Sequence, residues 1–316
     1  MSFTSDTKQE LLTLPMTECC KLAELSALFA VNGHLSISSD GIALVFQTTS
    51  LPLARKVIQS LKKLYHIQVE VVSKKQVKLQ KKSQYAVIVR EKVHSVINEL
   101  ALMDETKGFA QSIDDTLLLK ECDQRSFLKG AFLASGSINH PGSSSYHAEI
   151  TVQSEGFAVA LTELMNRFDL NTKYISKKKN YLVYIKESEK IADFLRIMGA
   201  TYALLTFEDE RIKRDFVNSI TRVMNMELAN QNKTLEAANR QLKHIAILEN
   251  LVDMSKLPDT LNEAIFLRKT YPEASLVELS EFSKDHFNKS ISKSGLNHRF
   301  RNISALAQEV LDDFNE

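Results

Sequence analysis

Hydrophobic positions follow two periodicities in the first two-thirds of the chain, and the whole pattern occurs twice. Spacings of three and four residues predict amphipathic helices, and alternation of apolar and polar residues predicts strands. The predicted helices cover 21–32, 54–64, 125–135 and 157–167, and the clearest strands fall within 69–89 and 174–185. Each half therefore reads helix, glycine turn, two strands, helix, two strands, helix, which predicts an α+β fold with an αββαββα duplication.

The first helix of each half shows the repeat most clearly, at an offset of 103 residues. The segment KLAELSALFAVN precedes Gly33, and RSFLKGAFLAS precedes Gly136. Both glycines are expected to end their helices in a left-handed C-cap conformation. Small residues spaced by four predict a close approach of the two helices. These small residues are Ala23, Ala27, Ser126 and Gly130.

The segments LSALFAVNG (25–33) and LKGAFLASG (128–136) resemble the paired LAGLIDADG motifs of homing endonucleases. The resemblance implies two helices packed at a pseudo-twofold axis and two saddle-shaped sheets that bind DNA. It also implies a metal-binding acid at the penultimate motif position, where this chain has Asn32 and Ser135. Metal-assisted phosphodiester hydrolysis needs carboxylate ligands. We therefore expect a DNA-binding scaffold that is not an enzyme, with a ligand-free structural duplication as the alternative.

Charge is informative only locally, because 40 basic and 39 acidic residues give a net charge of +1. Nine basic residues against two acids occur in 62–92, and six against two in 173–190. Lysines on the solvent face of two hairpins predict a surface for the DNA backbone. Protection of sheet edges against aggregation is the alternative. The candidate lysines are Lys74, Lys75, Lys78, Lys81, Lys82, Lys177, Lys178 and Lys179.

Residues 208–254 contain no glycine or proline and predict one or two long helices. Asparagines recur there every seven residues and would form a slowly drifting polar stripe. The stripe consists of Asn218, Asn225, Asn232 and Asn239, with Arg222 beside it. It faces either DNA or the neighbouring domain, or it is a solvated face. A dimeric coiled coil is a third interpretation.

The C-terminal region predicts three helices. Pro258 lies at the start of the first helix, and Tyr271-Pro272 ends it. Ser275 and Glu278 form a capping box for a second helix that is expected to reach about Phe282. A polar stretch, 283–290, precedes the last helix, which starts near Ser292. Its buried stripe is predicted to be Leu296, Phe300, Ile303, Ala307 and Val310.

The opposite side of this last helix carries residue types that read DNA. Arginine and lysine reach guanine edges, asparagine can pair with adenine, and serine or histidine can contact phosphates. A short capped helix, a turn and a polar-faced helix together predict a helix-turn-helix motif. A helical protein-interaction module is the alternative. The candidate DNA contacts are Lys293, Ser294, Asn297, His298, Arg299 and Arg301.

Other function classes find little support in the sequence. The three cysteines, Cys19, Cys20 and Cys122, have neither zinc-finger nor disulfide-framework spacing, so we expect no metal site and no cofactor. There is no apolar run long enough to span a membrane and no signal-peptide pattern. These observations favour a cytoplasmic protein with no membrane or small-molecule partner.

The combination of motifs is more specific than any one of them. The LAGLIDADG-like duplication, the segment NSITRVMNMELANQNKTLEAANRQL (218–242) and the C-terminal SLVELSEF and ISKSGLNHRFRNI together resemble the WhiA family of sporulation and cell-division regulators. The resemblance covers essentially the whole chain. It implies a cytoplasmic or nucleoid-associated protein that binds double-stranded DNA through a helix-turn-helix at about 275–309, with roles in transcription, division or chromosome organisation.

Four regions are predicted from these observations. They are a first LAGLIDADG-like lobe at 1–110, a second at 111–205, a helical linker at 206–254 and a helix-turn-helix domain at 255–316. The predicted function is non-enzymatic DNA binding in regulation, with protein regulators or division proteins as further partners. The alternative is an adaptor of the division machinery whose DNA contact is incidental.

Overall fold

The computed structural model describes the whole chain except residues 1, 40, 76–82, 105–107, 144 and 316. The chain divides into two compact units, Met1–Asp215 and Phe216–Glu316. Within the described residues, no helix has both the length and the apolar character that crossing a membrane requires.

The first unit contains the predicted duplication. The first repeat consists of α2 (Glu18–Asn32), β1 (Gly33–Ser38), β2 (Gly41–Thr48), α3 (Leu51–Tyr65), β3 (Val69–Lys75), β4 (Ser83–Val89) and α4 (Val93–Glu99). The second consists of α5 (Glu121–Ser135), β7 (Gly136–Ile138), β8 (Ala148–Val152), α6 (Glu155–Asn166), β9 (Lys173–Lys177), β10 (Asn180–Ile185) and α7 (Ser188–Met198). Both repeats have the order αββαββα, so the predicted fold class is confirmed.

Shorter elements complete the first unit. The helix α1 (Phe3–Thr13) precedes the first repeat. The strands β5 (Met103–Asp104) and β6 (Gly108–Phe109) and the 3-10 helix η1 (Asp115–Leu118) connect the two repeats.

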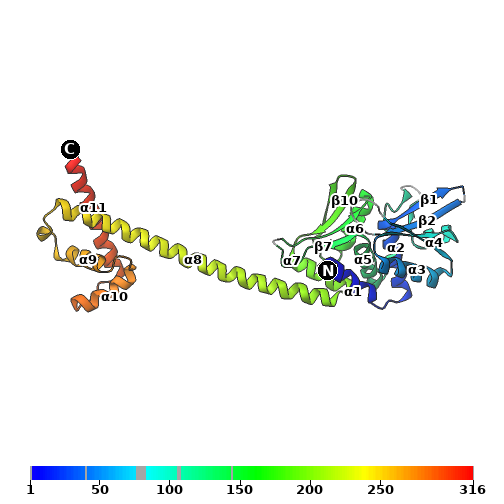
Figure 1. The fold of residues 1–316 in the computed structure, drawn as a ribbon, viewed down its shortest axis with the longest axis horizontal. Helices are drawn as coiled ribbons and strands as arrows, with labels where there is room; N and C mark the ends of the chain where they lie inside the picture. Colours follow the sequence, from blue (N-terminus) through cyan, green and yellow to red (C-terminus); the bar gives the residue numbers. More distant parts are fainter. Residues whose placement is uncertain (1, 40, 76–82, 105–107, 144, 316) are drawn as a thin grey trace. The chain divides into compact units, whose positions relative to one another are not determined.

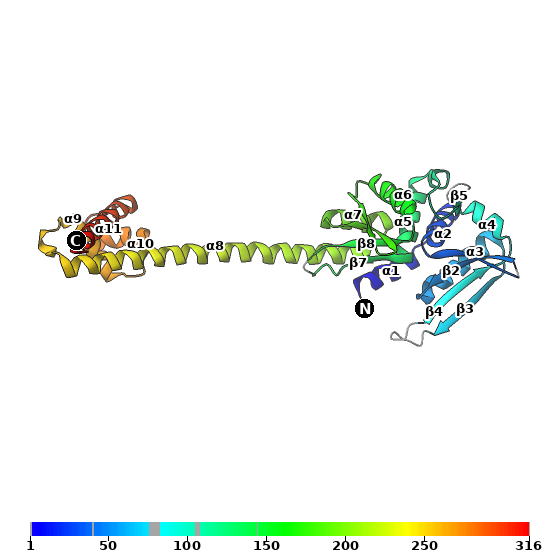
Figure 2. The ribbon, with the colours of Figure 1, turned by 90° about the horizontal axis from the view of Figure 1, so that it is seen from above.

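Each repeat forms one antiparallel four-stranded sheet. The strand orders are β1-β2-β4-β3 and β7-β8-β10-β9. Figure 2 labels β2, β3 and β4 of the first sheet. One face of the first sheet is in the core, where Leu44, Phe46 and Val87 are completely buried. The basic strands β3 and β9 are both edge strands, and every residue of β9 is exposed.

Helices α2 and α5 lie side by side (Figure 1), and small residues allow their backbones to approach closely. A Cβ atom added to Gly130 would lie 2.5 Å from the carbonyl oxygen of Glu24 and 3.0 Å from the Cβ of Ala27. Ala23 and Ala27 are completely buried, and Ser126 is also buried. The predicted close packing of the two repeats is therefore confirmed.

The two glycines that follow these helices are not left-handed caps, and that prediction was wrong. Gly33 has φ −95° and Gly136 has φ −67°, both with extended ψ angles. A Cβ at Gly33 would collide with the carbonyl oxygen of Phe29, and one at Gly136 would collide with the ring of Phe132. Glycine is needed at both positions because a strand begins directly after each helix. A side chain at this point would collide with the last turn of that helix.

A buried ion cluster links α2 to its neighbours. Glu24 is 2% exposed, and its two carboxylate oxygens lie 3.0 Å from the Nζ atoms of Lys56 on α3 and Lys129 on α5. Burial lowers the pKa of Lys56, and the charge of Glu24 opposes that shift. The single carboxylate is therefore shared by two ammonium groups in the first unit.

The long helix α8 (Thr201–Leu251) begins in the first unit and ends in the second. It is one continuous helix and starts seven residues before the predicted position. The second unit continues with η2 (Met254–Lys256), α9 (Asp259–Thr270), α10 (Leu276–Phe287) and α11 (Lys293–Asn315). Its core gathers Ile245 and Leu248 of α8 with apolar residues of the three later helices.

Candidate nucleic-acid interface

The last helix, α11, is fixed by the stripe that the sequence predicted to be buried. Leu296, Phe300, Ile303 and Ala307 are at most 2% exposed and lie in the core of the second unit. Val310 is partly buried at the edge of the same core. The backbone N–H of Gly295 donates to the Oγ of Ser292 at 3.1 Å and satisfies one free amide at the helix start.

The helix before it, α10, begins at the predicted capping box. The backbone N–H of Glu278 donates to Ser275 Oγ at 3.3 Å, and the N–H of Ser275 donates to the Glu278 carboxylate at 2.7 Å. These bonds lower the pKa of Glu278. Both hydrogen bonds of the motif are therefore present.

The end of α10 differs from the prediction, because the helix continues past Phe282 to Phe287, and only 288–290 of the predicted polar stretch lies outside it. Ser283 is completely buried, accepts the N–H of Ile291 at 2.8 Å and donates to the carbonyl of Ser280 at 2.7 Å. Asn288 then reverses the chain with φ +51°. The connection to α11 is consequently only five residues long, which suits a helix-turn-helix motif.

Five of the six predicted contact residues lie exposed on α11. They are Lys293, Ser294, Asn297, His298 and Arg301. Lys293, Asn297 and Arg301 are spaced by four residues, so they follow one side of the helix away from its buried stripe.

Arg299 lies differently from these five residues. Its Nη1 donates to the carboxylate of Glu263 on α9 at 2.8 Å and to the carbonyl of Thr260 at 2.9 Å. Glu263 also accepts from Lys289 at 2.5 Å. Burial alone would raise the pKa of Glu263, but Lys289 and Arg299 hold it below its ordinary value. The contacts of Arg299 therefore support a role in orienting α11 against α9.

A second structural arginine was missed by the sequence reasoning. Arg268 is 1% exposed, donates to Gln241 at 2.9 Å and to the carbonyl of Ala274 at 2.5 Å, and lies over the ring of Phe300. It thus ties the loop before α10 to both α8 and α11. Arg268 lies near the end of α9, and nothing in the sequence around it indicated that it would be buried.

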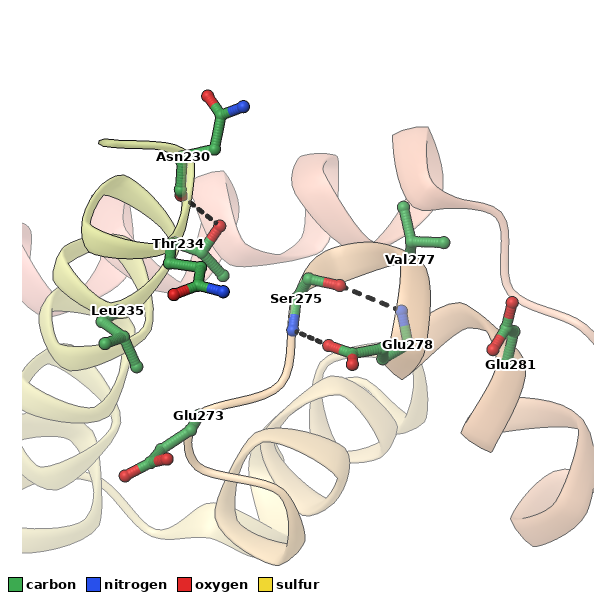
Figure 3. Close-up of a pocket in the computed structure, with 9 residues that line it drawn as sticks. Asn230, Thr234, Leu235, Glu273, Ser275, Val277, Glu278 and Glu281 are labelled. Carbon is green, nitrogen blue, oxygen red and sulfur yellow. Dashed lines mark hydrogen bonds between the residues drawn. The ribbon is translucent and has the colours of Figure 1, made fainter. Parts of the chain in front are cut away.

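A hollow between α8 and the start of α10, in the second unit, has the wrong charge for nucleic acid. Its volume is about 600 Å³. Figure 3 shows Glu278 turned back toward Ser275, and Glu273 and Glu281 also line the hollow. These three carboxylates disfavour the binding of phosphate in this hollow.

The predicted sheet lysines are described only in part. Lys74 on β3 and Lys177, Lys178 and Lys179 at the β9–β10 turn are exposed. Lys178 takes φ +57° in that turn. The side chain of Lys75, and Lys78, Lys81 and Lys82, lie outside the described residues.

The degenerate motif positions lie at the ends of α2 and α5. Asn32 Nδ2 donates to the carbonyl of Ala134 on the other helix at 3.0 Å, and Ser135 Oγ donates to the carbonyl of Thr151 at 2.6 Å. Asn32 lines an open hollow of about 400 Å³, whose described lining has amide, hydroxyl and imidazole groups and no carboxylate. Both side chains therefore donate to backbone carbonyls, and the described lining of the hollow supplies no carboxylate for a divalent metal.

The asparagine stripe of α8 is exposed along its whole length. Asn218, Arg222, Asn225, Asn232 and Asn239 all reach solvent. Roughly half a turn away, the apolar side chains of Ile212, Phe216, Ile220 and Val223 are also exposed, by 43% to 65%. In the structure of this chain α8 therefore presents one polar and one apolar open face.

Comparisons with known proteins agree with this architecture. The model of the WhiA N-terminal LAGLIDADG-like domain matches residues 18–103. The WhiA LAGLIDADG-like domain matches 124–217, and the WhiA C-terminal HTH domain matches 220–307.

Several relatives match this chain over almost its whole length. The probable cell division proteins WhiA of Bacillus cereus (strain B4264) and Bacillus cytotoxicus are each 44% identical over 310 residues, covering 98% of this chain and 97% of the relative. The crystal structure of full-length DUF199/WhiA from Thermatoga maritima matches with a TM-score of 0.58 at 21% identity, covering 98% of this chain and 99% of that one. That match supports the fold, and the sequence identity over almost the whole length decides the membership: the chain belongs to the WhiA family.

Proposed function

We propose that this protein is a non-enzymatic, DNA-binding regulator of transcription and cell division that acts at the nucleoid. The observation that carries the proposal is the geometry of α11. Its apolar stripe is buried, a short turn joins it to a capped helix, and Lys293, Asn297 and Arg301 stand exposed in one row. Side chains of these types in such a row can reach base edges in the major groove. The name of the Bacillus relatives supports a connection with cell division.

The exposed sheet lysines would add affinity for the DNA backbone without reading sequence. Edge strands with a basic solvent face can lie along a polyanion, and each neutralised phosphate releases condensed counterions. Lys74 and Lys177 lie on corresponding edge strands of the two repeats, and Lys178 and Lys179 follow Lys177 in the β9–β10 turn. This correspondence favours a DNA surface over edge protection alone.

DNA retention without cleavage tests the proposal directly. The purified chain, mixed with sheared genomic DNA in Mg²⁺ buffer, should retain a recurrent subset of fragments and leave supercoiled plasmid intact, because Asn32 and Ser135 cannot replace carboxylate ligands. Fragment sequencing and gel analysis of the plasmid are the measurements. Nicking by the wild type that disappears in N32A/S135A would contradict the non-enzymatic proposal, and retention of no fragments in dilute buffer would contradict DNA binding.

Neutralising the sheet lysines should flatten the salt dependence of binding. For K74Q/K177Q/K178Q/K179Q we expect the slope of log affinity against log salt to decrease by about one unit for each phosphate that the variant no longer neutralises. Fluorescence anisotropy with a fixed duplex between low and moderate salt measures this slope. The matched control is K62Q/K120Q/K243Q/K256Q, which removes four exposed lysines elsewhere. Equal slopes for the two variants would show that the sheet lysines do not contact DNA.

A further inference from the structure

Three thiols and one carboxylate meet at the N-terminal ends of the paired helices. Cys19 and Cys20 are the second and third residues of α2, and Cys122 and Asp123 hold the same positions in α5. The three Sγ atoms and a carboxylate oxygen all lie within 4.8 Å of one another. The spacing in the sequence gave no sign of this cluster, because it forms only when the two repeats pair.

The size and chemistry of the cluster suit one zinc ion. In a tetrahedral site with Zn–S bonds of about 2.3 Å, ligand atoms lie roughly 3.8 Å apart. The cluster needs only small side-chain rotations to reach that spacing. Thiolates are soft ligands that favour zinc over magnesium or calcium. The free amides at two helix N-termini further favour negative charge at this position.

The burial of Asp123 is a second, independent sign of a cation. Its side chain is 6% exposed, and no lysine, arginine or histidine among the described residues forms a salt bridge with it. Its nearest side-chain partner is the Sγ of Cys122, at 3.6 Å. A buried carboxylate without a cationic partner is unfavourable, and a metal ion bound by the same cluster would balance its charge.

We propose that Cys19, Cys20, Cys122 and Asp123 bind one Zn²⁺ that joins the N-terminal ends of the two repeats. Four protein ligands would complete the coordination of the ion, so the site is structural and leaves no position for a substrate. It lies at the opposite end of α2 and α5 from Asn32 and Ser135, and it is independent of the DNA-binding proposal. Zinc binding releases the protons of the three thiols to solvent.

Metal content and cobalt spectroscopy test this site in the full-length protein. Protein purified under reducing conditions without chelator should hold about one zinc per chain by elemental analysis. For C20S/C122S we expect at most about a tenth of that content, and for D123N an affinity about tenfold lower in chelator competition. The matched control E18Q changes the exposed first residue of α2 and should retain the metal.

Titration of the wild type with Co²⁺ does not depend on the folding of any variant. It should give the sulfur-to-cobalt charge-transfer band and the intense visible bands of tetrahedral cobalt at one equivalent. Reduced wild-type protein with neither zinc nor these bands would overturn the proposal. Detection by mass spectrometry of a Cys20–Cys122 disulfide in place of the metal, in protein from a reducing cytosol, would also overturn it.

Discussion

Reversing the charge at Lys293 and Arg301 is expected to abolish the preference of this protein for its own DNA sites. Each good contact from such a side chain to a base edge contributes about 1–3 kcal/mol of discrimination, so the loss of two predicts at least roughly a 30-fold decrease in specific affinity. Affinity for unrelated duplexes should decrease less, because the exposed lysines of the first unit are unchanged. Competition binding in vitro and genome-wide mapping of K293E/R301E measure both effects.

The control for this experiment is K243E/K256E, which makes the same change in net charge at two exposed lysines of the second unit outside α11. If K293E/R301E occupies the same sites as the wild type, α11 does not read DNA sequence. If K293E/R301E loses its sites while cell division remains normal, the adaptor interpretation is favoured. The exposed apolar row of α8, which includes Phe216 and Ile220, would then be the first surface to examine for protein partners.

The features that the sequence predicted correctly are those with local signals. The capping box of Ser275 and Glu278 lies within four residues, and the buried stripe of α11 repeats every three or four residues along one helix. The duplication was visible because both helices have the same length and carry small residues at corresponding positions, such as Ala27 and Gly130. Such sequence patterns predict the structure of a single helix or strand, or show that the same element occurs twice.

The features that the sequence did not predict depend on contacts between distant segments. Ser283 is polar, and its segment was interpreted as part of the connection between two helices. In the structure its hydroxyl donates to the carbonyl of Ser280 and accepts the backbone N–H of Ile291, which follows the turn after α10. Arg299 was grouped with the DNA contacts because its partner Glu263 lies 36 residues away. The cluster around Cys20 and Asp123 combines residues about 100 positions apart. Composition and spacing cannot show which residue faces which until the helices are placed.

Removing the charge of Glu24 is expected to destabilise the first unit more than any surface substitution. In E24Q the buried ammonium of Lys129, which is 5% exposed, and that of Lys56 lose their shared anion. Removing one partner of a buried ion pair costs about 3–5 kcal/mol, since the remaining charge is neither paired nor hydrated. Hydrogen exchange of peptides from α2 and α5 and the urea midpoint of the first unit measure the loss. The exposed acid on the same helix provides the control E18Q, which should change stability by no more than about 0.5 kcal/mol.

A second substitution distinguishes the lost charge balance from simple damage to the core. In E24Q/K129M the buried cation is replaced by an apolar side chain of similar length, so the unpaired ammonium is removed and Lys56 can turn toward solvent. Replacing a buried ion pair with apolar groups is often neutral, and we therefore expect this variant to recover about half or more of the stability lost in E24Q. If E24Q/K129M is less stable than E24Q, the cost arises from packing around α2 and α5, and the ion cluster is not what stabilises the contact between the two repeats.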